Sequence, residues 1–379
     1  MTALAAFGLL WGAARGMGAR GFVPLVVMVV CSLVWRARSQ VRPETLAAVL
    51  LAAELWILEA RRQGGRDHTV WLVPLAWAWA NVHNTWFLGL GLIGIHLLND
   101  LAGGRRVRGA GRRSPDRPAR PLEAAADPGR LARVGLAALA ISFANPFGWR
   151  ALWQPFDFFL HQRNELVFST IGELGPIQWR TFWGGLPMLF AGWPLLLVAR
   201  ARRNGLDPVE ALLCLLLSAT ALRSQRFVGL YALVAAPYIS RDLDEWFARP
   251  WFPPIPRALR APLAALACVA AGLPEWTRAS LPIGIGFDWR KYPVAACDFM
   301  EAHGVRGRGF NQFGFSGFLL HRFWPDRTRL RGPGARGRLA GARPPLPLRL
   351  RTPGAEVLRT QPAAQPAGRR QHVGAGLCR

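Results

Sequence analysis

The alternation of hydrophobic and polar segments is clearest in residues 71–99, WLVPLAWAWANVHNTWFLGLGLIGIHLLN. Two apolar runs, Val70–Ala80 and Trp86–Leu98, lie on either side of the polar stretch Asn81–Thr85, and neither run contains Asp, Glu, Lys or Arg. A helix on the surface of a soluble domain has a polar face opposite its apolar stripe, whereas a helix that is apolar all round is buried in protein or in lipid. The pattern therefore predicts two helices of a multi-pass membrane protein, joined by a tight turn or by a polar break inside the membrane.

Similar apolar runs recur through the first 273 residues. They are Ala3–Ala14, Gly21–Trp35, Leu46–Leu58, Val70–Ala80, Trp86–Leu98, Val134–Ala144, Phe182–Val198, Val209–Leu222, Phe227–Ile239 and Ala261–Leu273. Most are shorter than the roughly 20 residues that a helix needs to cross a bilayer, although flanking Trp, Gly and Thr residues extend some of them. We predict an all-α polytopic membrane protein with about ten helices, some of them short or re-entrant.

Positive charge is concentrated between and after these runs. The stretch 100–133 holds nine Arg and four acidic residues, and 329–379 holds eleven Arg and one acid, out of a formal net charge of +25. Such a charge would suggest nucleic acid, but charge confined to loops is a signal of membrane topology. Residues 329–379 also lack any aromatic side chain on which a base could stack, so we expect no nucleic-acid partner. Arg-rich loops stay in the cytoplasm, which predicts that 100–133 is cytoplasmic and that 145–180 is an outer loop.

The composition divides the chain into three parts. Residues 1–273 form the predicted transmembrane domain. Residues 274–328 are predicted to be a partial extramembrane domain of α/β structure, with a short helix at Pro293–His303 and strand-like alternation at Gly304–Trp324. Residues 329–379 have seven Pro, eleven Arg and no periodic pattern, which is typical of a disordered tail or of GC-rich DNA translated out of frame.

Counting helices from the cytoplasmic loop puts Arg61–Asp67, Arg200–Asp207 and Ser240–Arg260 on the same side and gathers other polar residues on the outer face. The outer residues are Arg42, Glu44, Asn81, His83, Asn84, Asn145, Glu173, Gln178, Arg223 and Arg226. Outward arginines oppose the charge bias, and a phosphate or pyrophosphate ligand would explain them because the guanidinium group binds such oxygens bidentately. The alternative is that one helix is miscounted and the group is an artefact of the assumed topology.

Each candidate also has a purely structural explanation. The side chains of Asn81, His83 and Asn84 can hydrogen-bond a sugar or a diphosphate, or can form a polar turn between two helices. Asn145 precedes Pro and Gly and can cap a helix. Glu173 can serve as a base or a metal ligand, or can be a solvated charge in the outer loop.

Arg223 and Arg226 can clamp a phosphate or belong to a short hydrophilic hairpin. Glu54 is the one acid well inside an apolar run and is a functional candidate on that ground, although Arg61 and Arg62 are close enough to help it reach the membrane surface. The five cysteines are scattered and show no metal-ligand spacing. No nucleotide-binding, hydrolase or zinc-protease motif occurs either, so no residue is assigned to a metal.

Six short motifs occur in an order typical of one group of membrane proteins. They are VRPE (Val41–Glu44), WANVHNTWFLGL (Trp79–Leu90), ANPFGW (Ala144–Trp149), IGELGP (Ile171–Pro176), ALRSQRF (Ala221–Phe227) and YPVAACDFM with GRGFNQFGFSGFLLHRFWPDRT (within Tyr292–Thr328). With these motifs, residues 20–328 resemble a bacterial family of polytopic membrane proteins related to the GT-C glycosyltransferases. That superfamily includes protein mannosyltransferases and lipid-linked sugar transferases of the cell envelope.

The resemblance implies transfer of a sugar from a polyprenyl-phosphate carrier at the outer face of the bacterial inner membrane. The implied partners are membrane lipid and the polyprenyl-phosphate sugar donor. Among the outer-face residues, we take Glu173 as the catalytic carboxylate. The substrate-binding residues would be Arg42, Asn81, His83, Asn84, Asn145, Arg223 and Arg226. An outward carboxylate would deprotonate or orient the acceptor while arginines hold the departing phosphate, and a divalent metal is left open as a cofactor.

Two departures from the GT-C pattern predict a truncated or inactive copy. GT-C enzymes carry an acid in their first outer loop, but the first link here, Arg15–Arg20, has none. The segment Arg329–Gly332 stands where relatives have an aliphatic and aromatic strand, which suggests a frameshift. The alternative function is a non-enzymatic membrane component, either a transporter or an envelope-assembly subunit. A transporter would show internal repeats, which the sequence lacks.

Overall fold

The computed structural model describes residues 1–36, 43–103, 127–165, 168, 171–177, 179, 185–249, 255–276, 289–305, 311 and 313–324. The chain divides into two compact units, Met1–Gly334 and Ala335–Arg379, and all described residues belong to the first. Arg42, Gln178 and the tail 329–379 lie outside the described residues, so the predictions made for them stay predictions.

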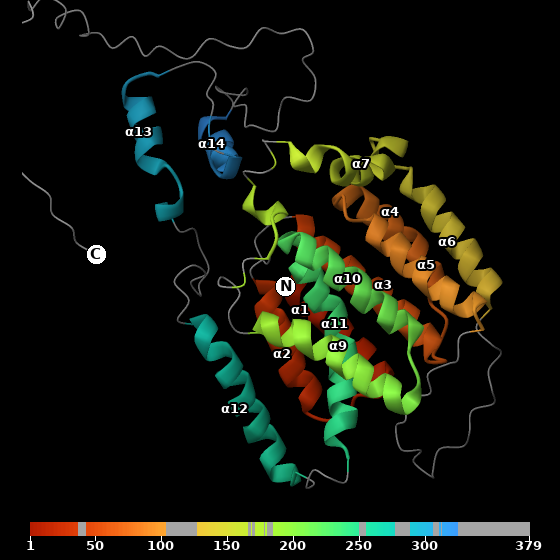
Figure 1. Ribbon diagram of the computed structural model, residues 1–379. Helices are drawn as coiled ribbons and strands as arrows, with labels where there is room; N and C mark the ends of the chain where they lie inside the picture. Colours follow the sequence, from red (N-terminus) through yellow and green to blue (C-terminus); the bar gives the residue numbers. More distant parts are fainter. Residues whose placement is uncertain are drawn as a thin grey trace, which may run out of the picture. The chain divides into compact units, whose positions relative to one another are not determined.

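The described part of the chain is helical (Figure 1). Its α-helices are α1 (Thr2–Gly16), α2 (Val23–Arg36), α3 (Pro43–Arg62), α4 (Leu72–Val82), α5 (Phe87–Leu101), α6 (Pro128–Ser142), α7 (Trp149–Leu160), α9 (Gly185–Asn204), α10 (Pro208–Arg223), α11 (Val228–Phe247), α12 (Arg257–Trp276), α13 (Val294–Ala302) and α14 (Ser316–Phe323). Its 3-10 helices are η1 (Thr69–Trp71), η2 (Gln162–Asn164), η3 (Gly172–Leu174), η4 (Gln225–Phe227), η5 (Trp289–Lys291) and η6 (Phe313–Phe315). These ranges contain no strand, so the all-α prediction is confirmed for them.

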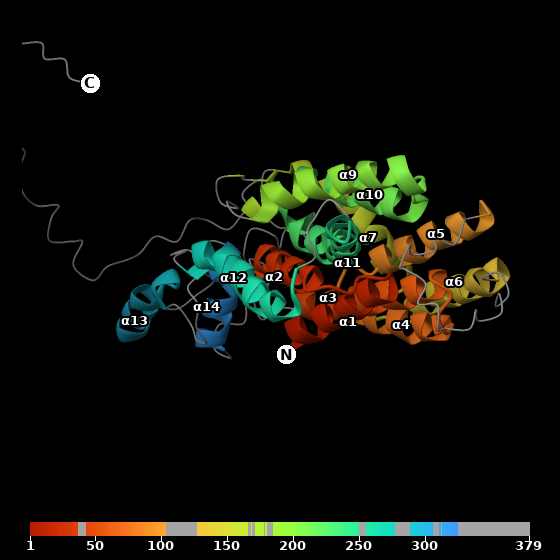
Figure 2. The ribbon, with the colours of Figure 1, turned by 90° about the horizontal axis from the view of Figure 1, so that it is seen from below.

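Helix α11 is the centre of the packing. Its residues Val228–Asp242 are all buried, and it packs against α1, α2, α3, α9 and α10. Figure 2 shows α11 end-on between α9 and α10 on one side and α1 and α3 on the other. The ring of Tyr231 meets Trp193 of α9 edge-on and the ring of Tyr238 stacks on it, with centroids 5.2 and 6.0 Å apart. A helix that is apolar on every side is suited to this position.

Over its described residues, each of the ten apolar runs predicted from the sequence lies mainly within a helix. The region 145–180, predicted as an outer loop, contains the helix α7, which was not predicted from the sequence, and its position outside the membrane stays a prediction. The exposed aromatic and leucine side chains of α7 are Trp149, Trp153, Phe156, Phe159 and Leu160. Most of them are three or four residues apart, which places them along one side of a helix.

Only α12, among the described helices, is both long and apolar enough to cross a membrane, and most of it is not buried by the rest of the chain. The helices α2 and α5 and the segment Thr69–Val82 are apolar but shorter. Large apolar side chains are exposed on other helices as well. For example, Leu98, Leu136 and Leu195 are 61%, 67% and 66% exposed. The helices are therefore confirmed, and their crossing of a membrane stays a prediction.

The predicted strands at Gly304–Trp324 are wrong where this segment is described, because it forms η6 and α14. The apolar side chains that pack between α13, η6 and α14 are Cys297, Met300, Phe315, Phe318, Leu319 and Phe323. The last four follow a helical spacing of three, one and four residues, which the many glycine and aromatic residues disguise as alternation. The helix predicted at Pro293–His303 is confirmed as α13.

At one end of the bundle, here called the ionic end, the last turn of α3 is tied to three other helices. Arg61 donates to Asp100 of α5 at 2.6 Å and to the carbonyl oxygen of Asp127, the N-cap of α6, at 3.0 Å. Arg62 donates to both carboxylate oxygens of Asp207, the N-cap of α10, at 2.8 and 2.9 Å. The end of α3 and the starts of α6 and α10 lie in segments that the predicted topology places together on the cytoplasmic side.

A buried ion network continues from Arg62 into the bundle. Arg62 and the hydroxyl of Tyr238 both donate to Glu59, at 2.8 and 2.7 Å. On α11, Arg241 donates to Glu210 of α10 and to its neighbour Asp242. The two arginine side chains are only 4% and 1% exposed. Charges buried this deeply are tolerated only when they are paired and hydrogen-bonded.

The pKa of Asp207 reflects this pairing. Burial by itself would raise it, but the positive charges of Arg62 and Arg241 and the hydrogen bonds from Arg62 and from the backbone of Glu210 hold it below the usual value. The carboxylate is therefore charged at neutral pH and keeps α3, α10 and α11 together.

Replacement of Arg62 by Met leaves Glu59 and Asp207 buried with one cation fewer. We expect Arg62→Met to lower the free energy of unfolding by about 3–5 kcal/mol, because an uncompensated charge stays buried. Thermal unfolding of the purified protein, followed by tryptophan fluorescence, measures the change.

Arg133→Met is the matched control. Arg133 is 78% exposed and lies 3.6 Å from Asp127, so its loss should change the free energy of unfolding by less than about 0.5 kcal/mol. Equal stability of the two variants would show that the network does not hold the helices.

Candidate functional site

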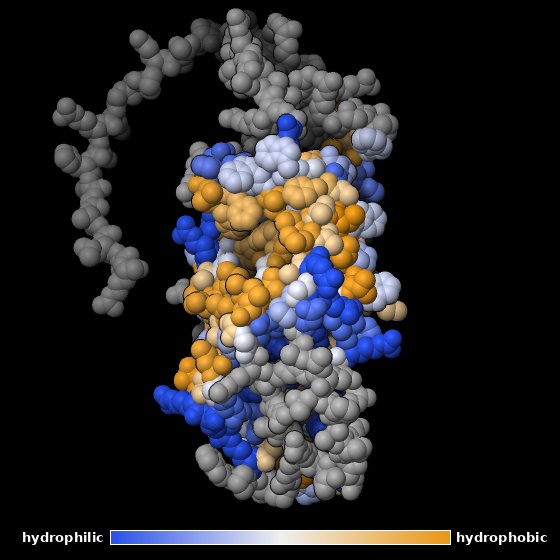
Figure 3. All heavy atoms as spheres, turned by 90° about the vertical axis from the view of Figure 1, so that its right-hand side faces the viewer, coloured by the Kyte–Doolittle hydropathy of each residue, from blue (hydrophilic) through white to orange (hydrophobic). Residues whose placement is uncertain are grey.

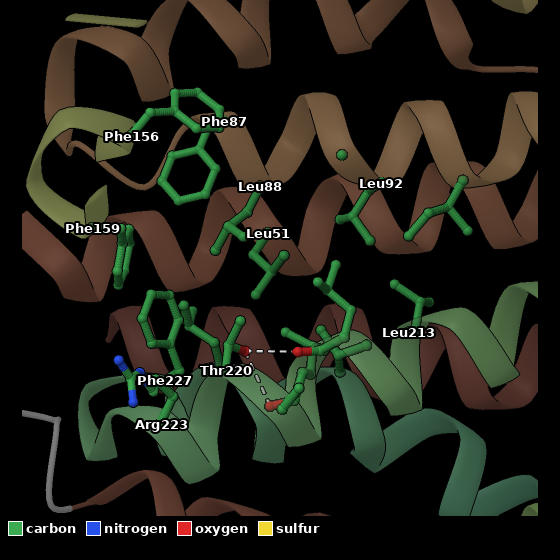
Figure 4. A pocket seen from close by; sticks show the side chains of 17 residues that line it. Leu51, Phe87, Leu88, Leu92, Phe156, Phe159, Leu213, Thr220, Arg223 and Phe227 are labelled. Carbon is green, nitrogen blue, oxygen red and sulfur yellow. Dashed lines mark hydrogen bonds between the residues drawn. The ribbon is translucent and has the colours of Figure 1, made fainter. Parts of the chain in front are cut away.

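An apolar groove of about 640 Å³ lies between α5, α7 and α10, with further walls from α3, η4 and α11. Its lining residues are Leu51, Phe87, Leu88, Gly91, Leu92, Ile95, Phe156, Phe159, Leu213, Leu216, Leu217, Ala219, Thr220, Arg223, Phe227, Leu230 and Val234. In Figure 4, Arg223 lies at the same end as the rings of Phe87, Phe156, Phe159 and Phe227, and Leu213 lies at the other end. The groove is therefore apolar along its walls and has one cation, Arg223, at one end.

The two polar residues of the groove differ in their hydrogen bonding. The hydroxyl of Thr220 donates to the carbonyl oxygens of Leu216 and Leu217, at 2.9 and 3.1 Å, so it is satisfied within its own helix (Figure 4). The guanidinium group of Arg223 is exposed and makes no side-chain hydrogen bond or ion pair within the described part of the chain. Figure 3 shows a hydrophobic, hollowed area on one face of the molecule, with hydrophilic residues at its sides. A ligand for such a groove is apolar along its length and anionic at one tip.

Arg163 adds a second positive charge beside Arg223. Its guanidinium group donates to the carbonyl oxygen of Arg223 and to that of Leu174, the latter at 3.0 Å. Partial burial and the charge of Arg223 lower the pKa of Arg163. A bound anion would relieve this repulsion.

The loop that carries Glu173 is joined to the loop that carries Arg223 and Arg226. The hydroxyl of Ser224 donates to the carbonyl oxygen of Glu173 at 3.2 Å, and the backbone N–H of Gln225 donates to that of Gly175 at 2.9 Å. The side-chain amide of Gln225 also donates to the carbonyl oxygen of Gly172. The structure thus brings together two motifs that are about 50 residues apart in the sequence.

The polar turn between α4 and α5 contacts the loop that carries Arg223 and Arg226, through the side chains of His83 and Arg226. Nη2 of Arg226 lies 3.5 Å from Nε2 of His83. On its other side, the imidazole ring lies 2.8 Å from the hydroxyl of Thr85. The loops that carry four of the predicted site residues, His83, Glu173, Arg223 and Arg226, are therefore joined, through backbone contacts and through the contact of His83 with Arg226.

The predicted asparagines have mainly structural partners. Asn81 is exposed and donates to the carbonyl oxygens of Trp77 and Ala144, at 2.9 and 3.1 Å. Asn145 donates to the carbonyl oxygens of Ser142 and Gly148, and its own side-chain oxygen accepts from the N–H of Phe147. These contacts hold the turn between α6 and α7. They do not make Asn145 the cap of the next helix, because the N-cap of α7 is Gly148 and no side chain bonds to that helix start. Asn84 is exposed in the turn.

Sequence reasoning missed Arg163, Phe156 and Phe159 as parts of the site. The aromatic spacing of α7 could have predicted the helix, but only the folded structure brings its rings to α10. The described ranges contain no group of three or more His, Cys, Asp or Glu side chains placed to hold a metal ion. Arg42, the remaining candidate, lies outside the described residues.

Glu54 of α3 lies one turn along the helix from the groove residue Leu51. It is fully buried, and neither of its carboxyl oxygens has a hydrogen-bond partner within the described part of the chain. Gly89 of α5 packs directly against it, since a Cβ atom at that position would clash with Oε2 of Glu54. The carboxyl group therefore occupies an apolar helix interface that gives it no compensation.

Comparisons of this chain with protein-family models, with curated proteins and with solved structures found no match. The GT-C resemblance accordingly stays an expectation based on the sequence motifs.

Two buried carboxyl groups of α3 should respond in opposite ways to the same substitution. Glu59 is paired with Arg62 and Tyr238, so Glu59→Leu should lower the free energy of unfolding by about 3–5 kcal/mol. Glu54 has no such partner, so Glu54→Leu should raise it by about 1–3 kcal/mol, since an unsatisfied polar group is removed.

Thermal unfolding of both variants against the unaltered chain measures the two effects. A loss of stability from Glu54→Leu as large as that from Glu59→Leu would contradict the assignment of Glu54 as unpaired.

Proposed function

We propose that this chain is a multi-pass inner-membrane protein that binds a lipid-linked sugar and transfers the sugar as GT-C glycosyltransferases do. The observation that carries the proposal is the apolar groove that ends at Arg223. The polyprenyl chain lies in the groove, and the phosphate lies at the arginines of the groove end.

The walls of the groove suit a hydrocarbon chain. Each buried methylene group contributes about 0.8 kcal/mol, and the only polar hydroxyl on the walls, that of Thr220, is already bonded within its helix. A free sugar or nucleotide would leave its own polar groups unpaired there. An apolar chain with a terminal anion satisfies both the walls and Arg223.

The exposed surface supports a lipid environment for the whole bundle. Apolar side chains such as Leu98, Leu136 and Leu215 are 61%, 67% and 69% exposed, which is unfavourable in water when such residues are numerous. Helix α12 has the length and composition of a membrane span. The exposed indoles of Trp149 and Trp153 on α7 suit the interface between lipid and water.

The proposed transfer step uses Glu173 and the arginines. The acceptor hydroxyl gives its proton to the carboxylate of Glu173 as its oxygen attacks C1 of the sugar. The bond between C1 and the phosphate oxygen breaks, and polyprenyl phosphate leaves with the electron pair of that bond. Arg223 and Arg226 stabilise the charge on the departing phosphate. The bonds between the loops of Glu173 and Arg223 support this division of roles.

Binding of undecaprenyl phosphate to the purified protein tests the proposal. We expect Leu217→Trp, which fills the groove, and Arg223→Gln, which removes the cation, each to weaken binding by about tenfold or more. Native mass spectrometry across a lipid titration measures the affinity.

Two variants serve as controls. Leu212→Trp changes an exposed residue of α10 that does not line the groove, and Arg202→Gln removes an exposed arginine at the ionic end. Both should bind the lipid as the unaltered chain does. If the groove variants also bind normally, the lipid is not held in the groove.

Glu173→Gln separates the enzymatic proposal from its alternative. It should abolish transfer of a labelled sugar from the polyprenyl-phosphate donor and leave the affinity for undecaprenyl phosphate unchanged. Lipid binding without transfer by the unaltered chain would instead support the non-enzymatic membrane component, a transporter or an envelope-assembly subunit.

A further inference from the structure

The carboxyl group of Glu54 adjoins the groove at the interface between α3 and α5. Leu51 of α3 and Leu92 of α5 line the groove (Figure 4). Glu54 follows Leu51 by three residues on α3. Gly89 likewise precedes Leu92 by three residues on α5, and residues three apart lie on one side of a helix. Since Glu54 packs against Gly89, their contact lies about one helical turn from the groove on both helices.

The interface offers this carboxyl group neither a hydrogen bond nor a positive charge. The side chain of Glu54 is 0% exposed, and no donor among the described residues reaches either of its oxygens. Gly89, the residue directly against it, has no side chain that could donate. A carboxylate buried without compensation is strongly disfavoured, and such a group keeps a proton instead. The neutral acid is therefore the form that suits this interface.

The titratable and charged groups of the helices that pack on α3 have other partners. Neither α4 nor η1 has any such group, and the only one on α1, Arg15, donates to a backbone carbonyl oxygen at 2.8 Å. On α11, Tyr231 donates to a backbone carbonyl oxygen of α9, and Tyr238 donates to Glu59. On α5, His96 lies 3.7 Å from Glu59. The other charges of α5 and α11 lie in the last two turns of these helices, so none of the described helices that pack on α3 presents a charge to the buried acid.

A proton is the ligand that suits a carboxyl group in this position. Along α3 the next charged residues, Glu44 and Glu59, are ten and five positions away. A metal ion requires several ligands, and the described ranges hold no group of three or more His, Cys, Asp or Glu side chains placed for one. An acid inside a membrane domain is a functional candidate, and the chemistry open to a single carboxyl group here is to take up and release a proton.

We infer that Glu54 is a proton-binding site linked to the groove. While an apolar chain fills the groove, water is excluded and the carboxyl group keeps its proton. While the groove holds water, the O–H bond breaks as pH rises, the proton passes to a water molecule and the carboxylate oxygen keeps the electron pair. Filling of the groove reverses this step, so ligand binding at high pH takes up one proton. The inference rests on the proposed function for the identity of the occupant as a lipid chain.

Infrared spectroscopy of the full chain measures the protonation of Glu54. The chain is held in nanodiscs of diether lipids, which have no carbonyl groups, and the C=O band of a neutral carboxyl group is followed. Subtraction of the spectrum of Glu54→Gln identifies the band, and Glu54→Leu serves the same purpose if the Gln variant does not fold. Glu165→Gln is the control, because Glu165 is exposed and an exposed carboxyl group is already ionised at about pH 7.

The band of Glu54 should be present at about pH 7 and should disappear as the pH is raised. Leu217→Trp, which fills the groove, and added undecaprenyl phosphate should each move the midpoint of this loss upward by about one pH unit or more, a tenfold change in proton affinity. By reciprocity, the affinity of the unaltered chain for the lipid should fall by up to about tenfold per pH unit above its midpoint. The affinity of Glu54→Gln should not fall in this way.

Two results overturn the inference. One is a neutral band at about pH 7 that Glu54→Gln leaves unchanged, and the other is an equal response to pH in the unaltered chain and in Leu217→Trp. A midpoint that rises in Leu217→Trp but not with the lipid supports the proton site and contradicts the lipid as the ligand of the groove. Failure of the proposed function is thereby distinguished from failure of the inference.

Discussion

The buried ion network at the ionic end is the constraint on which the positions of the other parts depend. Arg62 and Arg241 bring the ends of α3, α10 and α11 into fixed register through Glu59, Asp207 and Glu210. Burial of so many charges is costly, and only mutual pairing compensates for it. Since α10 rises about 1.5 Å per residue, its last residue is about 24 Å from the network. The network at one end of α10, together with the packing of this helix against α5, α9 and α11, therefore determines where Arg223 lies.

The opposite end of these helices has a different chemistry. There, among the described residues, Arg163 donates to the backbone carbonyl oxygens of Leu174 and Arg223, and Arg226 contacts the ring of His83. At the ionic end the arginines are paired with carboxylates, whereas at the groove end the arginines lie beside the apolar groove. The two ends of the bundle therefore differ in their charge pairing. The ionic end joins helices through paired charges, and the groove end suits an anionic ligand.

The helices were largely predictable, because long apolar runs without charges have few alternatives. The helix α7 was missed because Arg150, Pro155 and Asp157 interrupt its aromatic pattern. The strands expected before Trp324 were wrong because the spacing of the phenylalanines is helical. His83, Arg223 and Arg226 were found as site candidates through their charge and motif context. The groove itself and the contribution of Arg163 depend on contacts between distant segments, which no local pattern contains.

The most direct test of this account is the accessibility of the two ends from opposite sides of the membrane. In a cysteine-free background, Asn84→Cys probes the turn at the groove end and Arg202→Cys probes the ionic end. On intact cells with a permeabilised outer membrane, an impermeant maleimide should label Asn84→Cys, and it should label Arg202→Cys only after the inner membrane is opened. Labelling of both positions without opening that membrane would contradict the account.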